Sequence, residues 1–297
     1  SVTAGGSFKS AFSDGITITT GALVDTATYT FAGGLYDKDT TITVDGGLLV
    51  GNAAAEDVTV TTGAGSDTVT IQTDDTFVGQ AGDSGTIAIV TNAGDDTIVF
   101  DYGNLAAITN SQIATIDAGT GADTITKGAN ADNSTTVQAA VIYTINAGDS
   151  LTTATGHDTI SNFEFADGTN QSDVLQFDGT AIAGTLATST DAGTILSHSI
   201  GAAAIATFDD AATFATALVI SDSNLTDVIS YLDTNSNNNG VIAFLFDSTG
   251  NGANDATMIY HNAAGSAVNS LVQLSGVTAL DAIVVAQGTG ANDLVAL

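Results

Sequence analysis

The chain has 297 residues and a formal net charge of −30, from 33 acidic residues against three lysines. With no basic patch to meet phosphate, nucleic acid and anionic membranes are excluded as partners. A hydrophobic content of 43% excludes a disordered acidic tail, and the lack of cysteine excludes disulfides and thiolate metal sites.

The first region, residues 1–180, is predicted to be a β-repeat region built from short strands. β-Branched runs bounded by Gly, Asp and Asn occur at 58–60, 68–71, 86–90, 97–100 and 141–145. Their hydrophobic period is two, which predicts strands rather than helices.

The second region, residues 181–297, is predicted to be a β-rich domain with two short helices. One helix is expected over 208–219, with Asp209 and Asp210 in its first turn, and another over 225–232, capped by Ser223 or Asn224. Strands are expected at 241–246, 257–260, 270–274 and 282–285. The fold class is therefore mainly all-β, either a calcium-stabilised β-solenoid or β-roll, or a β-sandwich. No apolar run is long enough to cross a bilayer, so no membrane insertion is expected.

One motif, Gly-x-Asp-Thr-(Val/Ile), recurs along the first region. Its copies are 65–69, 94–98, 121–125 and 156–160, with the aspartates spaced by 29, 27 and 35 residues. Gly63 and Gly119 add an upstream glycine to two copies, which brings them close to the nonapeptide of calcium-binding β-solenoids.

The chemistry of this turn points to a hard cation. Glycine permits a turn that directs carbonyl oxygens inward, and the following aspartate adds a carboxylate, which together suit the oxygen coordination of Ca²⁺. The predicted calcium ligands in these turns are Gly63, Gly65, Asp67, Gly94, Asp95, Asp96, Gly119, Gly121, Asp123, Gly156 and Asp158. Their candidate partners are Asp57, Asp74, Asp75, Asp83, Asp117 and Asp149. The competing interpretation is an ordinary β-turn, which four copies in the same residue order disfavour.

A separate loop at 247–255 also carries alternating oxygen side chains. Asp247, Thr249 and Asn251 are spaced like the first half of an EF-hand loop, but the twelfth position is Met258 instead of an acidic residue. A calcium site at Asp247 and a plain hairpin turn are equally supported.

The order of these motifs resembles the RTX (repeats-in-toxin) group of type I secreted bacterial proteins. Residues 157–163 followed by 173–177 resemble the segment that closes the calcium repeats of that group, and Asp173 is taken as a metal ligand on this basis. Residues 243–247, 271–277 and 293–297 resemble its C-terminal secretion domain and signal. The resemblance implies several bound Ca²⁺ ions, export by a type I secretion apparatus and folding outside the cell; the composition is most similar to that of S-layer proteins.

No catalytic constellation stands out, so the chain is not expected to be an enzyme. The three histidines never occur as His-x-x-x-His, no Gly-x-Ser-x-Gly elbow or phosphate-binding loop is present, and His157 is expected to be an exposed turn residue.

Three functions follow from these observations. The first is a calcium-dependent, self-assembling structural protein of a bacterial S-layer or surface filament, with copies of itself and cell-surface polysaccharide as partners. The second is a calcium-dependent adhesin whose Thr-, Ser- and Asn-rich strands bind a glycan or ice. The third is the secretion and folding end of an enzyme whose catalytic part lies elsewhere.

Overall fold

The computed structural model describes residues 2–3, 16–19, 29–45, 58–72, 86–101, 113–128, 141–165, 173–177, 182–187, 194–201, 204–263, 268–278, 283–286 and 293–296. The chain divides into two compact units, which are described separately. The first comprises residues 1–144 and 164–174, and the second comprises residues 145–163 and 175–297.

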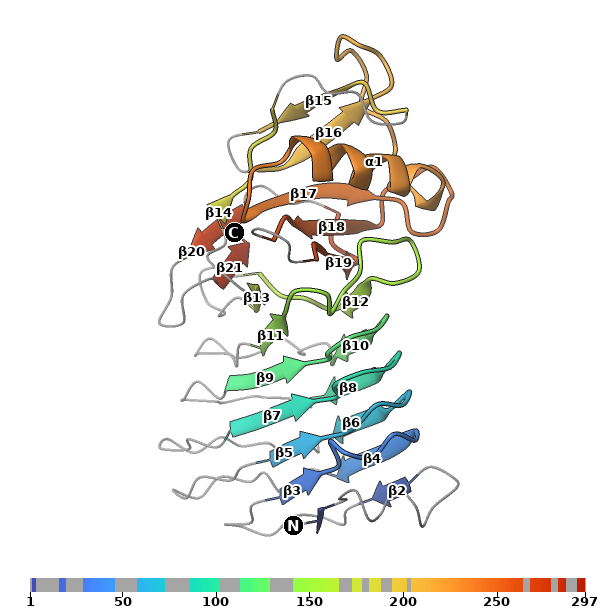
Figure 1. The fold of residues 1–297 in the computed structure, drawn as a ribbon, viewed down its shortest axis with the longest axis vertical. Coiled ribbons are helices and arrows are strands. Elements are labelled where there is room, and N and C mark those ends of the chain that lie inside the picture. Colours follow the sequence, from blue (N-terminus) through green and yellow to red (C-terminus); the bar gives the residue numbers. More distant parts are fainter. Residues whose placement is uncertain are drawn as a thin grey trace. The chain divides into compact units, whose positions relative to one another are not determined.

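The first unit is a parallel β-solenoid, most regular over about three turns. Each turn adds one strand to each of two parallel sheets, as Figure 1 shows for β5 to β10. Sheet A contains β1 (Val2–Thr3), β3 (Tyr29–Ala32), β5 (Val58–Thr61), β7 (Thr86–Val90), β9 (Ile113–Asp117) and β11 (Val141–Ile145). Sheet B contains β2 (Ile16–Thr19), β4 (Thr40–Asp45), β6 (Thr68–Gln72), β8 (Thr97–Asp101) and β10 (Thr124–Lys127).

The pairing register stacks identical positions of successive turns into columns. In sheet B the inward column Ile42, Val69, Ile98 and Ile125 is buried, and in sheet A the column Val60, Ile89, Ile116 and Tyr143 is buried. Strand residues alternate between the two faces, so every second residue is apolar and the intervening residues face outward. This alternation explains why the β-branched runs form strands here.

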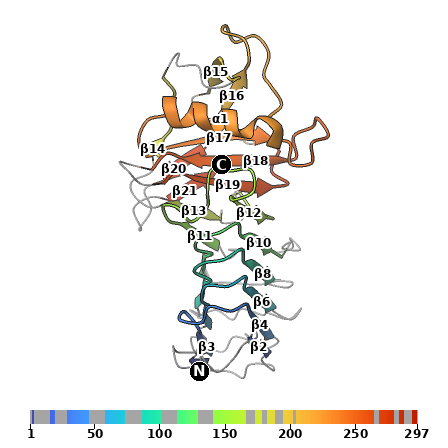
Figure 2. The ribbon, with the colours of Figure 1, turned by 45° about the vertical axis from the view of Figure 1, so that its right-hand side comes forward.

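The second unit combines strands with one helix in its described part (Figure 2). Strands β14 (Ile182–Ala183), β17 (Gly240–Phe246), β18 (Ala256–His261), β19 (Ser270–Ser275) and β12 (Asp158–Ser161) are neighbours in one sheet. Strand β21 (Asp293–Ala296) pairs with β13 (Val174–Phe177) and with β20 (Ile283–Ala286), and β15 (Ser197–Ile200) pairs with β16 (Ala206–Asp209).

Helix α1 (Asp222–Asn235) lies between β16 and β17 in both views (Figures 1 and 2). Its buried face, including Leu225, Val228 and Leu232, packs into a core with Phe208 and Phe244. Ser221 is the N-cap, and its backbone N–H donates to Asn224 Oδ1 at 2.8 Å. The helix predicted over 225–232 is confirmed, but it begins earlier, so the predicted caps Ser223 and Asn224 lie inside it. At 14 residues it is too short to cross a membrane, and no other helix in the described residues could do so.

The helix predicted over 208–219 is wrong. Residues up to Asp209 belong to β16, and 210–220 contain no helix. The Asp209 carboxylate accepts hydrogen bonds from the backbone N–H groups of Ala211, Ala215 and Thr216 at 3.0, 2.6 and 2.9 Å, which lower its pKa to about 2. An aspartate that collects nearby N–H groups in this way holds the chain in a loop and competes with helix formation.

Candidate functional site

Three of the recurring Gly-x-Asp-Thr turns form the corners that lead into β6, β8 and β10 of sheet B. Their aspartates, Asp67, Asp96 and Asp123, are each 1% exposed and stack from one turn of the solenoid to the next. The backbone N–H of Thr40 donates to Asp67 Oδ1 at 2.6 Å, that of Asp67 to Asp96 Oδ1 at 2.7 Å, and that of Asp96 to Asp123 Oδ1 at 2.8 Å. We call this stack the aspartate ladder. Each carboxylate therefore ties its own turn of the solenoid to the preceding one.

Threonine hydroxyls reinforce the same corner. Thr62 Oγ1 donates to the Thr91 carbonyl oxygen at 3.2 Å, and Thr91 Oγ1 donates to the Ala118 carbonyl oxygen at 2.8 Å. The backbone carbonyl groups are also used between turns, because Gly63 O accepts from Ala93 N and Asn92 O accepts from Thr120 N. Most polar groups named here are thus engaged in holding successive turns together.

The glycines are required by the closeness of this stacking. A Cβ atom on Gly94 would lie 2.0 Å from the carbonyl oxygen of Gly65, and one on Gly121 would lie 1.9 Å from that of Gly94. Gly63 and Gly119 are equally close to the carbonyl oxygens of Tyr36 and Asn92, at 1.5 and 1.7 Å. A glycine here lets the backbone of one turn approach the next.

An outer row of carboxylates accompanies the aspartate ladder. Asp39 Oδ1 accepts from Ser66 N at 3.1 Å, and Asp95 Oδ1 accepts from Ala122 N at 3.0 Å. Acidic and neutral residues therefore alternate along this exposed row, which keeps like charges two turns apart. In the aspartate ladder, by contrast, every one of three successive turns contributes an acid, so like charges lie only one turn apart.

Burial disfavours the ionised form of the carboxylates in the aspartate ladder. The Oδ2 atoms of Asp67 and Asp96 are buried and accept no hydrogen bond. Burial raises the pKa of Asp96 to about 6. The hydrogen bond from the Asp67 N–H opposes this rise, and the charges of Asp67 and Asp95 assist it. The pKa of Asp67 is raised for the same reason, burial. A buried carboxylate with one unused oxygen favours protonation.

Acidification is expected to stabilise the solenoid through Asp96. Its folded-state pKa of about 6 exceeds the unfolded value of about 3.9, so the folded chain takes up a proton first as the pH falls. Stability therefore rises as the pH falls through the folded pKa, and the gain is complete below the unfolded pKa. Asp96→Asn is expected to stabilise the chain at neutral pH by about 1–2 kcal/mol and to flatten the pH dependence.

Thermal unfolding followed by circular dichroism from pH 4.5 to 8 measures this effect. The matched control is Asp95→Asn, which removes the same charge from the exposed neighbouring position. It should leave most of the slope in place, because burial and not the Asp95 charge is the main cause of the raised pKa of Asp96. Identical slopes for the wild-type chain and Asp96→Asn would contradict a proton uptake at Asp96.

The aspartate ladder does not fit a calcium cage in this conformation. Oδ1 of each aspartate accepts a hydrogen bond from a backbone N–H. The corner carbonyl oxygens of Gly63, Asn92 and Thr120 accept hydrogen bonds from a neighbouring turn of the solenoid. Among the described residues, no three acidic or histidine side chains converge to share an ion. Ca²⁺ requires six to eight oxygen ligands. Calcium binding by Asp67, Asp96 and Asp123 stays a prediction. The acids Asp57, Asp74, Asp75 and Asp83 lie outside the described residues.

Asp173 lies in a buried charge cluster of the first unit. Lys127 Nζ lies 2.8 Å from Asp173 Oδ2 and 2.9 Å from Glu164 Oε2, and Lys127 and Asp173 are 1% and 0% exposed. The N–H groups of Val141 and Glu164 also donate to Asp173, each at 2.9 Å. Burial raises the pKa of Asp173, while Lys127 and the N–H donors oppose that rise.

Sequence reasoning missed Lys127. It occupies the inward column that contains Val44, Ile71 and Phe100 in the preceding turns. The available signal was its position two residues after the inward-facing Ile125, in a chain with only three lysines.

The fourth copy of the motif belongs to the second unit. Asp158 is buried, and its N–H donates to Ser150 Oγ at 2.7 Å. Asp149 Oδ2 accepts from Asn146 N at 2.8 Å, and Gly156 O accepts from Leu151 N. The expectation that His157 is exposed is wrong: it is 9% exposed, and its ring nitrogens contact Thr153 O at 2.8 Å and Gln273 Oε1 at 3.2 Å.

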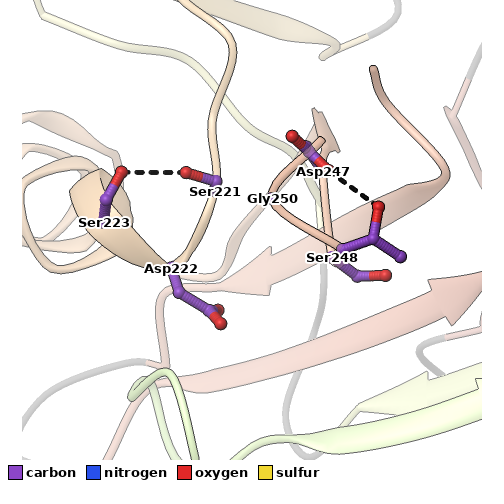
Figure 3. A pocket seen from close by; sticks show the side chains of 7 residues that line it. Ser221, Asp222, Ser223, Asp247, Ser248 and Gly250 are labelled. Carbon is purple, nitrogen blue, oxygen red and sulfur yellow. Dashed lines mark hydrogen bonds between the residues drawn. The ribbon is translucent and has the colours of Figure 1, made fainter. Parts of the chain in front are cut away.

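A pocket of about 310 Å³ lies between the Asp247 loop and the first residues of helix α1. Figure 3 shows Asp222 and Ser223 on one side and Asp247 and Ser248 on the other. Asp247 accepts hydrogen bonds from Gly252 N at 2.6 Å and Asn251 N at 3.2 Å. Burial opposes ionisation of Asp247, but these bonds prevail and lower its pKa. The lining offers oxygen atoms, which are the type of ligand that a hard cation prefers. Calcium binding at Asp247 stays a prediction.

Comparisons with protein-family models, with curated proteins and with solved structures find no match for this chain. Of the predictions made from the sequence motifs, the β-solenoid is confirmed, and the calcium binding and export that the RTX resemblance implies stay predictions.

Proposed function

We propose that the chain is an extracellular structural protein that assembles with copies of itself into a layer or filament on a bacterial surface, with Ca²⁺ promoting the assembly. The observation that carries the proposal is the use of the repeated motif. Its glycines, aspartates and threonines join successive turns of the solenoid, as the bonds of Asp67, Asp96 and Thr91 illustrate. Residues that join successive turns in this way build a stiff repeating scaffold.

Charge gives the reason for a cation in this proposal. A chain with a net charge of −30 repels its own copies at low ionic strength. Divalent cations reduce this repulsion and can bridge carboxylates of neighbouring chains, and Ca²⁺ accepts mixed carboxylate, hydroxyl and carbonyl ligands. Export by a type I apparatus and contact with surface polysaccharide belong to the same proposal.

Electron microscopy of the purified chain tests the assembly. We expect ordered sheets or filaments in millimolar Ca²⁺ that disperse when a chelator is added, and fewer or none in Mg²⁺ at the same ionic strength. A monodisperse monomer in all three conditions would overturn the proposal.

A calcium titration locates the ion. Saturation at a hundred times the Kd is expected to stabilise the chain by about 2.7 kcal/mol per site, measured as a rise in melting temperature. Asp247→Asn should weaken the calcium response, because it removes a carboxylate that lines the pocket. Asp227→Asn is the matched control, since it removes one charge from a surface carboxylate that accepts from Thr194. Equal responses of the two variants would exclude Asp247 as a ligand.

A further inference from the structure

Threonines form two adjacent columns on the outer face of sheet B. The pairing register aligns Thr17, Thr41, Thr68, Thr97 and Thr124 in one column. It aligns Thr19, Thr43, Thr70, Val99 and Thr126 in the other. We call these ten positions the threonine face; nine of them are threonine, and the tenth is a β-branched residue of nearly the same shape.

The threonine face is open and uncharged. Thr17, Thr19, Thr41, Thr97 and Thr124 are exposed, and the remaining positions are half-buried by their neighbours. Neither column contains a charged residue, although the chain carries a net charge of −30. The residues between the columns, such as Ile98 and Ile125, point into the core. This fixes which way the threonines face.

The two columns make a two-dimensional lattice of hydroxyl and methyl groups. Neighbouring strands are about 4.8 Å apart, and residues two apart along a strand are separated by about 6.6 Å. Threonine is stiff at χ1, because both of its γ atoms are attached to Cβ, so the groups are held in place before any ligand arrives. Little conformational entropy is lost on binding to such a face.

We propose that the threonine face binds ice. A surface that repeats in two directions is complementary to a ligand that also repeats in two directions, and the spacing between strands lies close to one of the oxygen spacings on the prism face of ice. Hydroxyl groups can take the place of water molecules in that lattice, while the methyl groups fill the spaces between them. One threonine gains little over liquid water, but ten positions in register bind together. This activity does not depend on the structural role proposed above.

Other ligands fit the threonine face less well. Sugars are commonly held by stacking on exposed aromatic rings, whereas the face has none, and Phe31, Tyr36 and Phe100 of this unit are buried. A mineral surface would require charged groups. A second copy of the chain would have to overcome the repulsion between two strongly negative molecules, and this face offers no carboxylate that a cation could bridge.

The outer face of sheet A provides an internal comparison. Its corresponding columns are Thr30, Thr59, Ala88, Thr115 and Ile142, and Ala32, Thr61, Val90, Asp117 and Thr144. These columns mix threonine with alanine, larger aliphatic residues and a carboxylate. The same solenoid therefore carries one regular and one irregular face.

Inhibition of ice recrystallisation by the full chain, with and without Ca²⁺, tests the proposal. The wild-type chain is expected to inhibit crystal growth. Thr97→Tyr places a large ring in the middle of the threonine face, and tyrosine is well tolerated in strands, so we expect about a tenfold or greater loss of inhibition. Thr115→Tyr makes the same change on sheet A and should retain wild-type inhibition.

A measurement on the unmodified protein removes the dependence on variants. Fluorescently labelled wild-type chain is expected to bind the prism planes of a single ice crystal. No inhibition and no plane binding by the folded chain would overturn the proposal, and so would an equal loss in Thr115→Tyr. Sedimentation of the wild-type chain as an assembly that Thr97→Tyr disperses would assign the face to a second copy and overturn ice binding, without affecting the structural role.

Discussion

Replacing Gly94 with alanine is expected to lower the free energy of unfolding by about 3 kcal/mol or more. Gly94 has φ = +138°, a conformation that L-residues rarely adopt. Its added Cβ would also meet the Gly65 carbonyl oxygen at 2.0 Å. That oxygen belongs to the backbone of the preceding turn, which is held by hydrogen bonds to its neighbours, so it cannot move aside as a flexible side chain would. Relief of the overlap requires separation of the turns.

Gly250→Ala is the control for Gly94→Ala. Gly250 also has a positive φ, +70°, but no atom lies within 4 Å of a Cβ placed there. For this variant we expect the free energy of unfolding to fall by only about 1 kcal/mol, the cost of placing an L-residue at a positive φ. Urea unfolding followed by circular dichroism measures both variants. Equal losses would show that the close approach of successive turns is not what requires glycine at position 94.

Lys127→Met is expected to destabilise the chain by about 3–5 kcal/mol, the usual cost of removing one partner from a buried ion pair. Asp173 is fully buried, and Lys127 Nζ lies 2.8 Å from its carboxylate. The methionine would fit the inward column that Ile71 and Phe100 precede, so lost packing contributes little. The destabilisation comes from a buried carboxylate left without its cation.

Two controls separate this charge effect from a general sensitivity to substitution. Lys38→Met changes an exposed lysine and should alter stability by no more than about 0.5 kcal/mol. Adding Asp173→Asn to Lys127→Met removes the stranded charge and should restore much of the loss. The single variant should also regain stability at low pH, where Asp173 is protonated. Wild-type stability of Lys127→Met would contradict the pairing.

Nine of the 21 strands that the structure describes were predicted from the sequence, because their signals are local. The runs at 86–90 and 141–145 coincide with β7 and β11, and those at 241–246 and 270–274 match β17 and β19 within one residue. β-Branched residues that alternate with polar ones and end at Gly, Asp or Asn have few other conformations available. The second helix was predictable for the same reason, because its apolar spacing lies within one segment. Its N-cap was predicted wrongly, since Ser221 takes that place instead of Ser223 or Asn224.

The helix expected over 208–219 failed although its apolar spacing is helical. That prediction placed Asp209 at a helix N-terminus, where a carboxylate stabilises the first turn. In the fold, Asp209 ends β16, and its carboxylate gathers the N–H groups of a loop instead. Both arrangements use the same interaction, and the pairing of β16 with β15 decides between them.

The recurring Gly-x-Asp-Thr turn shows most clearly where sequence and tertiary structure divide. The sequence by itself determined that the turns recur, that each opens a strand, and that the strands form a mainly β fold. Only the tertiary structure decided that Asp96 accepts the N–H of Asp67, that Lys127 meets Asp173, and that the threonines of successive turns align. These partners are separated by 27 to 46 residues, so they depend on how many residues each turn of the solenoid contains. The spacing of the motif, 29 and 27 residues, already indicates that number, but only the stacked turns show which atoms meet across it, because those contacts depend on the packing of one turn on the next.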